Sequence, residues 1–351
     1  MIIMGVPKIQ AVGTAVPNYA LEQREIKQFV TALFHSHVAN LEHLLPVFEN
    51  SCIHVRHFSQ PLDWYGTTHS FAEANQIFEQ VALDLSEIAA LKAMQKAHVK
   101  PEDIGMVIFV SSTGIVTPTL DAKIIQRLGL SSHTGRLPIW GLGCGGGVSG
   151  LARAAEISQS LQGKSVLLIT VELCSLTFQQ NDYSKSNLVG TSIFADGAAA
   201  AVITVDGDGP AILGNYSTLF PDSADIMGWD LVETGFKVRF SRDIPSIVRR
   251  YLPNLITGAC TKWNIDQNNI VHYVAHPGGA KVLSAYRESL GLTNDKLTYA
   301  YDILASNGNM SSASVLFVLE KFMAETAPSN DYGVMLALGP GFSAEQVLFQ
   351  W

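Results

Sequence analysis

The stretch Trp140-Gly-Leu-Gly-Cys-Gly-Gly-Gly-Val-Ser-Gly150 sets one cysteine among closely spaced glycines. The short apolar run Leu137–Trp140 before it predicts the end of a strand, and Gly150–Leu161 after it has apolar residues at helical spacing. Cys144 is therefore expected on a tight glycine turn that leads into a helix N-terminus. Because free N–H groups and the helix dipole favour an anion there, we expect the thiol to ionise readily. The alternative is a buried, unreactive cysteine on a glycine-rich turn.

Strand-like and helix-like runs alternate along the rest of the chain. Ile104–Val110 and Ser165–Val171 predict strands that are covered on both faces, whereas Phe71–Ala97 and Ala280–Leu290 predict helices. Residues 107–205 and 271–351 have a similar order of predicted elements, a weak internal echo. Each segment has a strand, a turn with a reactive group, a helix and further strands. This echo predicts two similar α/β halves whose reactive groups meet at the junction, a common place for active sites.

Composition narrows the class of protein. The chain has 351 residues, of which 47% are hydrophobic and 15% charged, as expected of a soluble α/β protein with a large core. Its formal net charge of -8 argues against a broad nucleic-acid surface. We find no secretory signal and no apolar run long enough to span a membrane. The four cysteines have no C-x-x-C spacing, so we expect reduced thiols in the cytoplasm and neither a disulfide frame nor a metal site.

Two further motifs supply groups that a reactive cysteine needs. One is Val274-Ala-His276-Pro-Gly-Gly-Ala-Lys281, in which a histidine follows a predicted strand; alone, such a histidine is more often structural. The other is Ala305-Ser-Asn-Gly-Asn309-Met-Ser-Ser-Ala313, just before a helix predicted over 311–324, where asparagine is also a favoured cap. Together with the cysteine turn, the motifs provide a nucleophile, a base and an amide donor.

This set of side chains suits condensation of thioesters. A Cys144 thiolate would attack a thioester and hold its acyl group, with His276 stabilising the thiolate as an ion pair. His276 and Asn309 would donate hydrogen bonds to a thioester carbonyl, which stabilises the enolate that forms when a malonyl group loses carbon dioxide. That carbanion would then attack the acyl group on Cys144, in a Claisen condensation. Asparagine fits because it is a neutral donor at every working pH.

The chain resembles the type III polyketide synthases, the chalcone synthase-like family, along essentially its whole length. The resemblance rests on Gly143-Cys144, His276-Pro-Gly-Gly279, Gly308-Asn309-Met-Ser-Ser312, Phe194-Ala-Asp-Gly-Ala-Ala-Ala200 and Gly339-Pro-Gly-Phe342. It implies an α/β thiolase fold, with similar halves at 1–206 and 207–351 in a layered αβαβα arrangement. It also implies acyl-CoA starters, malonyl-CoA extenders, a homodimer and no bound cofactor.

The resemblance implies further residues around the substrate. Phe194 aligns with the phenylalanine that gates the CoA tunnel, and Val238 aligns with a second gate that is aromatic in plant members. Thr117 stands where plant members carry a methionine that crosses the dimer interface, and Cys174 stands where they have threonine. Gly278 and Gly279 belong to the histidine motif. The loop of Gly339, Pro340 and Gly341 is a further element of the family. Glu172 or Thr177 would position a water molecule that takes part in cyclisation of the product.

The departures from plant members suggest an enlarged cavity. Smaller or more apolar residues at 117, 174 and 238 would open space for a long apolar substrate. Ile139-Trp-Gly-Leu-Gly-Cys144 and Met227-Gly-Trp-Asp230 are most similar to bacterial synthases that start from long-chain fatty acyl-CoA and release alkylpyrones or alkylresorcinols. The basic residues that bind CoA phosphates in plant members are not matched at Pro46–Asn50, although Arg56 fits a family arginine. The alternative role of Arg56 is a structural ion pair. An acyl carrier protein, in place of CoA, is also left open as the donor of the acyl starter.

Three other interpretations stay open at this point. A ketoacyl-carrier-protein synthase III or a hydroxymethylglutaryl-CoA synthase would use a related thioester chemistry, but the contexts of Gly339–Phe342 and His276–Gly279 favour the polyketide family. Papain-like proteases also order Cys, His and Asn along the chain, yet their cysteine has a different local signature. A non-catalytic scaffold that kept the fold is the third, and three intact catalytic positions argue against it.

Overall fold

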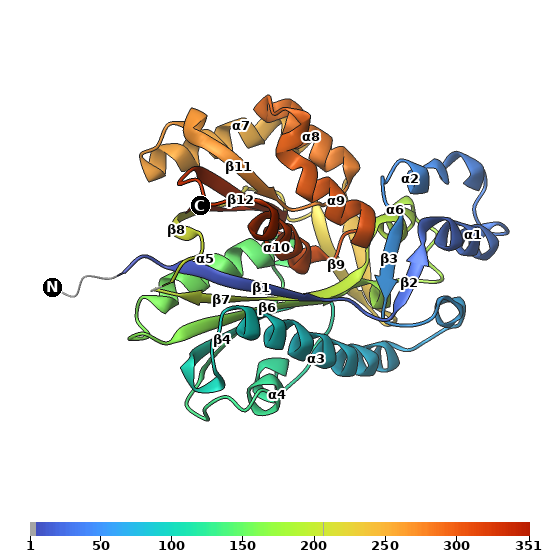
Figure 1. The fold of residues 1–351 in the computed structure, drawn as a ribbon. Helices are drawn as coiled ribbons and strands as arrows, with labels where there is room; N and C mark the ends of the chain where they lie inside the picture. The colour runs from blue at the N-terminus through green and yellow to red at the C-terminus, as the bar shows by residue number, and fades with distance from the viewer. Residues whose placement is uncertain (1–4, 206) are drawn as a thin grey trace.

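A single mixed β-sheet of nine strands forms the centre of the molecule (Figure 1). The computed structural model describes residues 5–205 and 207–351. Strand order across the sheet is β5-β4-β6-β7-β1-β8-β13-β12-β11. In chain order the strands are β1 (Lys8–Ala15), β4 (Ile104–Val110), β5 (Gly135–Ile139), β6 (Ser165–Leu173), β7 (Asp196–Thr204), β8 (Ala211–Leu219), β11 (Ile270–Ala275), β12 (Tyr332–Gly339) and β13 (Ser343–Gln350).

Strand pairing repeats across the middle of this sheet. On one side, β4 and β6 are parallel and β6 and β7 antiparallel. On the other, β11 and β12 are parallel and β12 and β13 antiparallel. The two sides join where β1 pairs with β8 through Lys8 and Ala211. This repetition explains the internal echo seen in the sequence.

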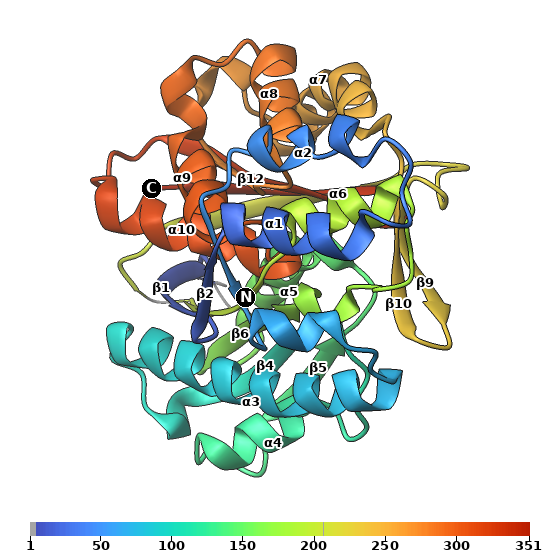
Figure 2. The same cartoon turned by 90° about the vertical axis from the view of Figure 1, so that its right-hand side faces the viewer.

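Helices form three layers around the two sides of the sheet (Figures 1 and 2). Two central helices, α5 and α10, contact strands of both sides, while α3 and α4 cover one outer face and α7, α8 and α9 cover the other. The predicted αβαβα layering is thus confirmed. The bounds of these helices are α3 (Phe71–Lys96), α4 (Leu120–Arg127), α5 (Gly146–Ser158), α7 (Ile244–Trp263), α8 (Ala280–Leu290), α9 (Thr298–Asn307) and α10 (Ser314–Glu325).

Burial on both faces explains the composition of the central strands. Every residue of β6 is buried, and so is β7 except for its last residue, Thr204. Small alanines at 198–201 let α3 and α10 pack closely on opposite faces of β7. The helix expected at 71–97 begins with a capping box in which Ser70 accepts from the Glu73 N–H, and it ends one residue earlier than predicted.

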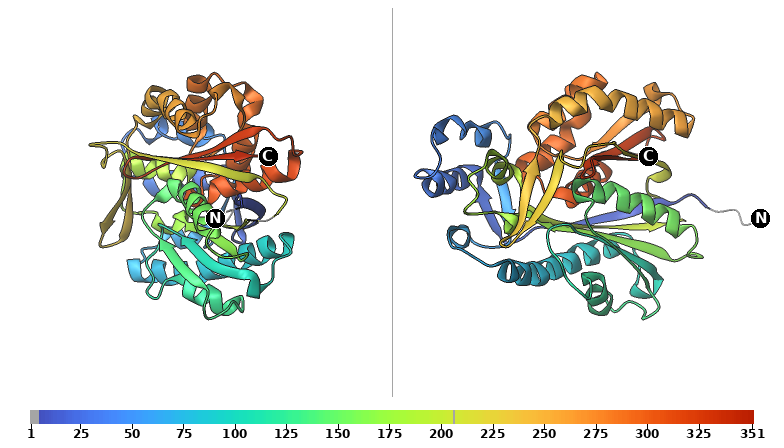
Figure 3. Two further views of the ribbon diagram at one scale, coloured as in Figure 1. Left: turned by 90° about the vertical axis from the view of Figure 1, so that its left-hand side faces the viewer. Right: turned by 180° about the vertical axis from the view of Figure 1, so that it is seen from behind.

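Smaller elements lie at one end of the layers. They are β2 (Tyr19–Glu22), α1 (Gln23–Phe34), α2 (Pro46–Glu49), β3 (Val55–Phe58), α6 (Lys185–Ile193), β9 (Met227–Val232) and β10 (Gly235–Phe240). Strands β9 and β10 pair only with each other, as a hairpin that projects from the body in Figure 2 and in the left view of Figure 3. Within the described residues, no helix combines the length and apolar character that crossing a bilayer requires.

Candidate active site

Cys144 lies in a 3-10 turn, Gly143–Gly145, between β5 and the central helix α5. The helix begins at Gly146, four residues earlier than the sequence suggested. Glycine is required at 147, because a Cβ there would come within 2.3 Å of the Ser312 carbonyl oxygen at the start of α10. The turn itself is held by the Ser112 hydroxyl, which accepts from the Gly143 N–H at 3.1 Å. The two central helices therefore meet at the cysteine.

His276 follows directly after β11 and is held by its backbone. Its N–H donates to the Leu336 carbonyl at 2.9 Å, and its own carbonyl accepts from the Gly278 N–H at 3.0 Å. The side chain is buried, and neither ring nitrogen has a hydrogen-bond partner among the described residues. Gly278 lies against the ring, since a Cβ there would meet an imidazole carbon at 3.4 Å. The backbone hydrogen bonds and the contact with Gly278 therefore set the position of the imidazole, whose two nitrogens form no hydrogen bond within the described residues.

Asn309 lies between α9 and α10, and hydrogen bonds hold both the nitrogen and the oxygen of its carboxamide. The amide nitrogen donates to the Gly278 carbonyl at 3.1 Å, and the oxygen accepts from the Ser311 N–H at 2.8 Å. The Asn309 backbone N–H donates to the Ile193 carbonyl at 2.8 Å. The alternative role as a helix cap is not met, because Met310 is the N-cap of the short turn Ser311–Ala313, Ala313 is the N-cap of α10, and neither has a side-chain cap hydrogen bond. One amide hydrogen remains available for a substrate oxygen.

The prediction that Cys144 ionises readily is wrong for the folded protein. Burial raises the pKa of the Cys144 thiol to about 11, and the Glu172 charge adds to this, although the side chains of Ser311 and Asn309 act in the opposite direction. Burial also lowers the pKa of His276 to about 3, so the imidazole is neutral. Loss of hydration outweighs the favourable field of the helix N-terminus. The pair therefore consists of a neutral thiol and a neutral imidazole.

A cavity of about 410 Å³ brings Cys144, His276 and Asn309 together. Gly278 and Gly279 line it as predicted, and apolar side chains form much of its wall: Leu44, Val47, Val189, Ile193, Met227, Phe240, Ile244, Pro245, Val282 and Leu338. Three exposed cationic residues, Lys185, Arg242 and Lys281, also line it, and none of the three forms an ion pair within residues 5–205 and 207–351. The volume falls within the range of about 300–1,000 Å³ that is usual for small-molecule sites.

Phe194 lines a second, smaller cavity of about 40 Å³ and does not line the cavity that contains Cys144. Its ring stacks on Phe240 at 5.4 Å and lies tilted against Trp229 at 5.8 Å between centroids. Cys174, Thr177 and Val238 were expected beside the substrate, but they line this smaller cavity together with Phe194. The structure therefore does not bring these three residues to the cavity that contains Cys144.

Arg56 does not occupy a position that fits CoA phosphates. The residue is 0% exposed, and its guanidinium donates to Gln23 and to the backbone carbonyls of Thr191 and Phe194. Burial lowers its pKa to about 9, while the Asp196 charge acts in the opposite direction. The alternative, a structural ion pair, is not found among the described residues either; the hydrogen bonds of Arg56 hold the backbone next to Phe194.

The loop of Gly339, Pro340 and Gly341 supports the cysteine turn and does not line the larger cavity. A Cβ on Gly339 would come within 2.9 Å of the Gly145 nitrogen, and a Cβ on Gly143 would come within 2.8 Å of the Pro340 ring. Gly341 faces Leu219. Thr117 is exposed in the connection between β4 and α4 and lines none of the described cavities. The chain therefore brings only part of the predicted set to the cavity that contains Cys144.

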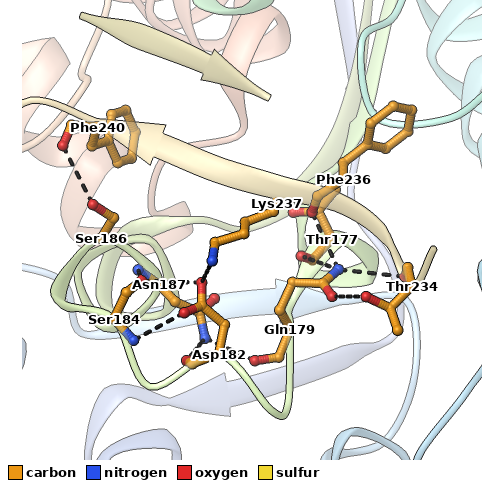
Figure 4. A network of polar contacts seen from close by, with 10 residues as sticks. All are labelled: Thr177, Gln179, Asp182, Ser184, Ser186, Asn187, Thr234, Phe236, Lys237 and Phe240. Carbon is orange, nitrogen blue, oxygen red and sulfur yellow. Dashed lines mark hydrogen bonds and ion pairs between the residues drawn. The ribbon is translucent and has the colours of Figure 1, made fainter. Parts of the chain in front are cut away.

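A polar network joins the β9–β10 hairpin to residues 177–187 (Figure 4). The buried Gln179 amide nitrogen lies 3.4 Å from the Thr234 carbonyl and 3.3 Å from the Phe236 carbonyl, and its oxygen accepts from the Thr234 hydroxyl. Asp182 and Lys237 form a more exposed ion pair at 3.4 Å. The hairpin is thus fastened to the loop that precedes α6.

The same network reaches Phe240. The Ser186 hydroxyl donates to the Phe240 carbonyl at 3.4 Å, and the Asn187 amide donates to the carbonyls of Gln179 and Asp182 at 2.8 and 2.7 Å. Because Phe240 lines the cavity that contains Cys144, residues 179–187 support one wall of that cavity.

Sequence reasoning missed several polar residues around the site. Ser112 holds the cysteine turn, and Ser312 donates to Glu172 at 2.6 Å. Burial raises the pKa of Glu172 to about 7, against the effect of hydrogen bonds from Ser312, Ser112 and Thr113. Tyr286 also lines the catalytic cavity. The two serines of the Asn309 motif were a usable signal for Ser312, whereas nothing near Tyr286 marked it.

Comparisons with known proteins agree along the whole chain. The sequence models of chalcone and stilbene synthases match residues 2–207 with their N-terminal domain and residues 212–350 with their C-terminal domain. A putative chalcone synthase of Bacillus subtilis is 41% identical over 358 residues, covering 98% of each protein. A 1,3,6,8-tetrahydroxynaphthalene synthase of Streptomyces peucetius is 34% identical over 351 residues, covering 98% of this chain and 93% of the relative.

Solved structures agree as well. The crystal structure of 1,3,6,8-tetrahydroxynaphthalene synthase from Streptomyces coelicolor, described as a bacterial type III polyketide synthase, has a TM-score of 0.94 at 27% identity and covers 98% of this chain and 99% of that one. The C-terminal type III polyketide synthase domain of Steely1 from Dictyostelium has a TM-score of 0.91 at 26% identity, over 98% and 99% of the two chains. The chain therefore belongs to the chalcone and stilbene synthase family, and it is a type III polyketide synthase, an enzyme of acyl transfer.

Proposed function

We propose that this enzyme loads a long-chain fatty acyl group from CoA onto Cys144 and extends it with malonyl-CoA. Cyclisation of the extended chain would then release an alkylpyrone or an alkylresorcinol. The proposal rests on one observation: Cys144, His276 and Asn309 line the same cavity of about 410 Å³, and the rest of its wall is largely apolar. An apolar wall of this extent favours an aliphatic chain over a small polar starter.

The loading step follows from the neutral state of the pair. As the Cys144 sulfur attacks the thioester carbonyl, His276 accepts the thiol proton, so that no thiolate is needed beforehand. The acyl group is transferred to sulfur, and CoA leaves as its thiol after taking that proton from His276. The pKa of about 3 means that the His276 imidazole is unprotonated at neutral pH, so that a ring nitrogen can accept the thiol proton.

The extension step uses the oriented amide. Asn309 and His276 would donate hydrogen bonds to the malonyl thioester oxygen, on which negative charge develops as carbon dioxide leaves. The resulting enolate carbon attacks the acyl group on Cys144, which returns the sulfur as the leaving group. Both donors are neutral, so they stabilise the charge of the enolate without trapping it as a fixed ion pair.

Recognition of CoA is proposed at the three exposed cations of the catalytic cavity. Lys185, Arg242 and Lys281 would bind the phosphates, in place of the basic residues that the segment Pro46–Asn50 lacks and of the buried Arg56. Replacement of any of them by glutamate should raise the KM for malonyl-CoA and leave the KM for a malonyl pantetheine thioester unchanged. A matched change at Lys262, on the outer helix α7, should alter neither value.

Subunit organisation is part of the same proposal. Residues 1–206 and 207–351 would form the two halves, and two copies of the chain would form a homodimer in which the exposed Thr117 approaches the partner's cavity. Light scattering should therefore give twice the mass of one chain. A phosphopantetheine arm of an acyl carrier protein would enter by the same route as CoA, because both present the same thiol arm.

Mass spectrometry of products tests the proposal. Purified enzyme is incubated with malonyl-CoA and starters of increasing chain length, plus one aromatic starter and one sample without a starter. Pyrones or resorcinols from the long starters support the proposal, and a strong preference for the aromatic starter contradicts it. Tetrahydroxynaphthalene from malonyl-CoA alone would replace it with the activity named for two relatives. A single two-carbon extension would point to a ketoacyl synthase role.

A further inference from the structure

Tyr286 is a buried tyrosine without a partner in the catalytic cavity. It lies on α8 with 1% of its surface exposed, and it lines the same cavity as Cys144, His276 and Asn309. Its hydroxyl has no hydrogen-bond partner among residues 5–205 and 207–351. A ring that merely filled space could be phenylalanine, so the hydroxyl needs a reason.

Another buried tyrosine of the same protein shows the usual arrangement. The Tyr65 hydroxyl lies 2.6 Å from the Ser175 hydroxyl and is thereby satisfied within the protein. A buried hydroxyl without such a partner destabilises the folded state, because it has lost its hydrogen bonds to water. Tyr286 therefore carries a polar atom that the folded chain alone leaves unused, and it lines the same cavity as His276, whose two ring nitrogens are also unpartnered.

The helix that carries Tyr286 starts beside the histidine turn. Side chains on a helix tilt toward its N-terminus, and α8 begins at Ala280, directly after the turn that holds His276. Burial raises the pKa of Tyr286, and Tyr286 and Cys144 line the same cavity. The phenol therefore stays protonated at neutral pH and acts as a donor.

We propose that the Tyr286 hydroxyl donates a hydrogen bond to a carbonyl or carboxylate oxygen of the thioester substrate in the catalytic cavity. It would act beside the Asn309 amide, as a second neutral donor from a different helix. This inference rests on the proposed thioester chemistry. Either the acyl starter or the malonyl extender could supply the oxygen, and the two are separated by measuring the two half-reactions.

Replacement of Tyr286 by phenylalanine removes only the hydroxyl. We expect Y286F to melt at the same temperature as the wild type or higher, since an unsatisfied buried group is lost. The kcat/KM of one half-reaction should fall roughly tenfold to hundredfold. Loss of acyl transfer to Cys144, followed by intact-protein mass, would assign the starter oxygen. Loss of malonyl-CoA decarboxylation, followed by release of carbon dioxide, would assign the extender oxygen.

Two matched variants sharpen the comparison. Y65F removes a hydroxyl that is bonded within the protein, so its melting temperature should fall. Y299F removes a hydroxyl 3.3 Å from Thr326, outside the cavity, and both half-reactions should stay within twofold of the wild type. The inference is overturned if Y286F keeps both rates, or if it melts lower in the manner of Y65F and its rates fall only in proportion to the folded fraction.

A binding measurement separates this inference from the proposed function. The probe is a malonyl-CoA analogue in which a methylene group replaces the thioester sulfur, titrated calorimetrically into wild type and Y286F. Weaker binding to Y286F by tenfold or more supports the contact even if the wild type turns over none of the thioesters offered. Equal binding together with normal wild-type turnover refutes the Tyr286 contact and leaves the proposed function intact.

Discussion

The Asn309 carboxamide donates a 3.1 Å hydrogen bond to the Gly278 carbonyl, and so ties the asparagine turn to the histidine turn. The two residues are 31 positions apart in the chain. Because Gly278 also packs against the His276 ring, this bond sets the asparagine amide in a fixed relation to the imidazole. The two donors thus depend on each other for position, which leads to the first prediction.

Asn309→Ala should reduce malonyl-CoA decarboxylation by roughly a hundredfold to a thousandfold, the usual effect of losing one donor to a developing oxyanion. Acyl transfer to Cys144 should fall much less, because the sulfur and the imidazole remain. Decarboxylation is followed by carbon dioxide release and loading by intact-protein mass. Equal losses in the two steps would mean that the asparagine acts mainly by holding the histidine turn.

Cys144→Ala should abolish every product that contains the starter while leaving part of the malonyl decarboxylation, because His276 and Asn309 remain. The measurement is the yield of acetyl-CoA against that of condensed product, with circular dichroism to verify folding. A folded variant that loses both activities completely would contradict this division of roles between the thiol and the two donors.

Val238→Phe should shorten the starters that the enzyme accepts. Val238 borders the cavity of about 40 Å³ that Phe194 also lines, and a larger ring would fill that space. Overpacking should also lower the free energy of unfolding by about 1–3 kcal/mol. The chain-length profile of the products provides the readout, with Val238→Ile as the smaller matched change. An unchanged profile in a stable phenylalanine variant would show that starters do not pass Phe194.

Gln179→Ala should loosen the hairpin that forms one wall of the catalytic cavity. The change removes buried hydrogen bonds to Thr234 and Phe236, so amide hydrogen exchange at 227–240 should become faster and the product profile broader. Lys237→Met is the control, because its ion pair with Asp182 is more exposed and contributes about 0–1 kcal/mol at most. If the lysine variant shows the larger effect, the ion pair and not the glutamine holds the hairpin.

Glu172→Gln should change how stability depends on pH. Burial raises the pKa of Glu172 from 4.5 to about 7 in the folded protein. The folded state therefore binds this proton more tightly than the unfolded state, and the stabilisation is present below pH 4.5 and is lost as the pH rises toward 7. The variant should gain stability relative to wild type between pH 5 and pH 8, by up to about 3 kcal/mol.

The free energies of unfolding of wild type and Glu172→Gln are compared by denaturant titration at pH 5 and pH 8. Asp196, whose pKa burial raises to about 6, is present in both proteins and cancels in the difference. The glutamine can accept from Ser112 and Thr113 with its oxygen and donate to Ser312 with its nitrogen, so the network survives. A difference in stability that does not vary with pH would show that Glu172 is not protonated on folding.

The turns that contain Cys144, His276 and Asn309 were predicted correctly from local sequence, because glycine and proline mark turns between regular elements. The turns at Cys144, His276 and Asn309 each lie between a strand or helix and a following helix, as their spacing indicated. Their meeting in one cavity was expected from the internal echo and from the family resemblance. Neither source of information could give the ionisation of the thiol, because hydration depends on residues far away in the chain.

The prediction for Arg56 and the omission of Tyr286 have the same cause, which is packing between residues far apart in the chain. Arg56 stands near the positions of the family's basic residues, but which face of β3 is buried decides its role, and that face packs under the backbone of Phe194. Tyr286 occupies an ordinary buried position on an amphipathic helix, and only the cavity formed with Cys144 and Asn309 makes its hydroxyl notable. Long-range packing of this kind leaves no local pattern in a single sequence.

The contact between Gly147 and the Ser312 carbonyl has a consequence for biosynthesis. Cys144 emerges from the ribosome well before His276 and Asn309, and its neighbours are completed only when α10 packs against α5. Large proteins fold progressively during synthesis, with N-terminal parts first. The thiol of a nascent chain therefore has neither its base nor its amide donors, and catalytic competence is a late event of folding, acquired when the final strands join the sheet.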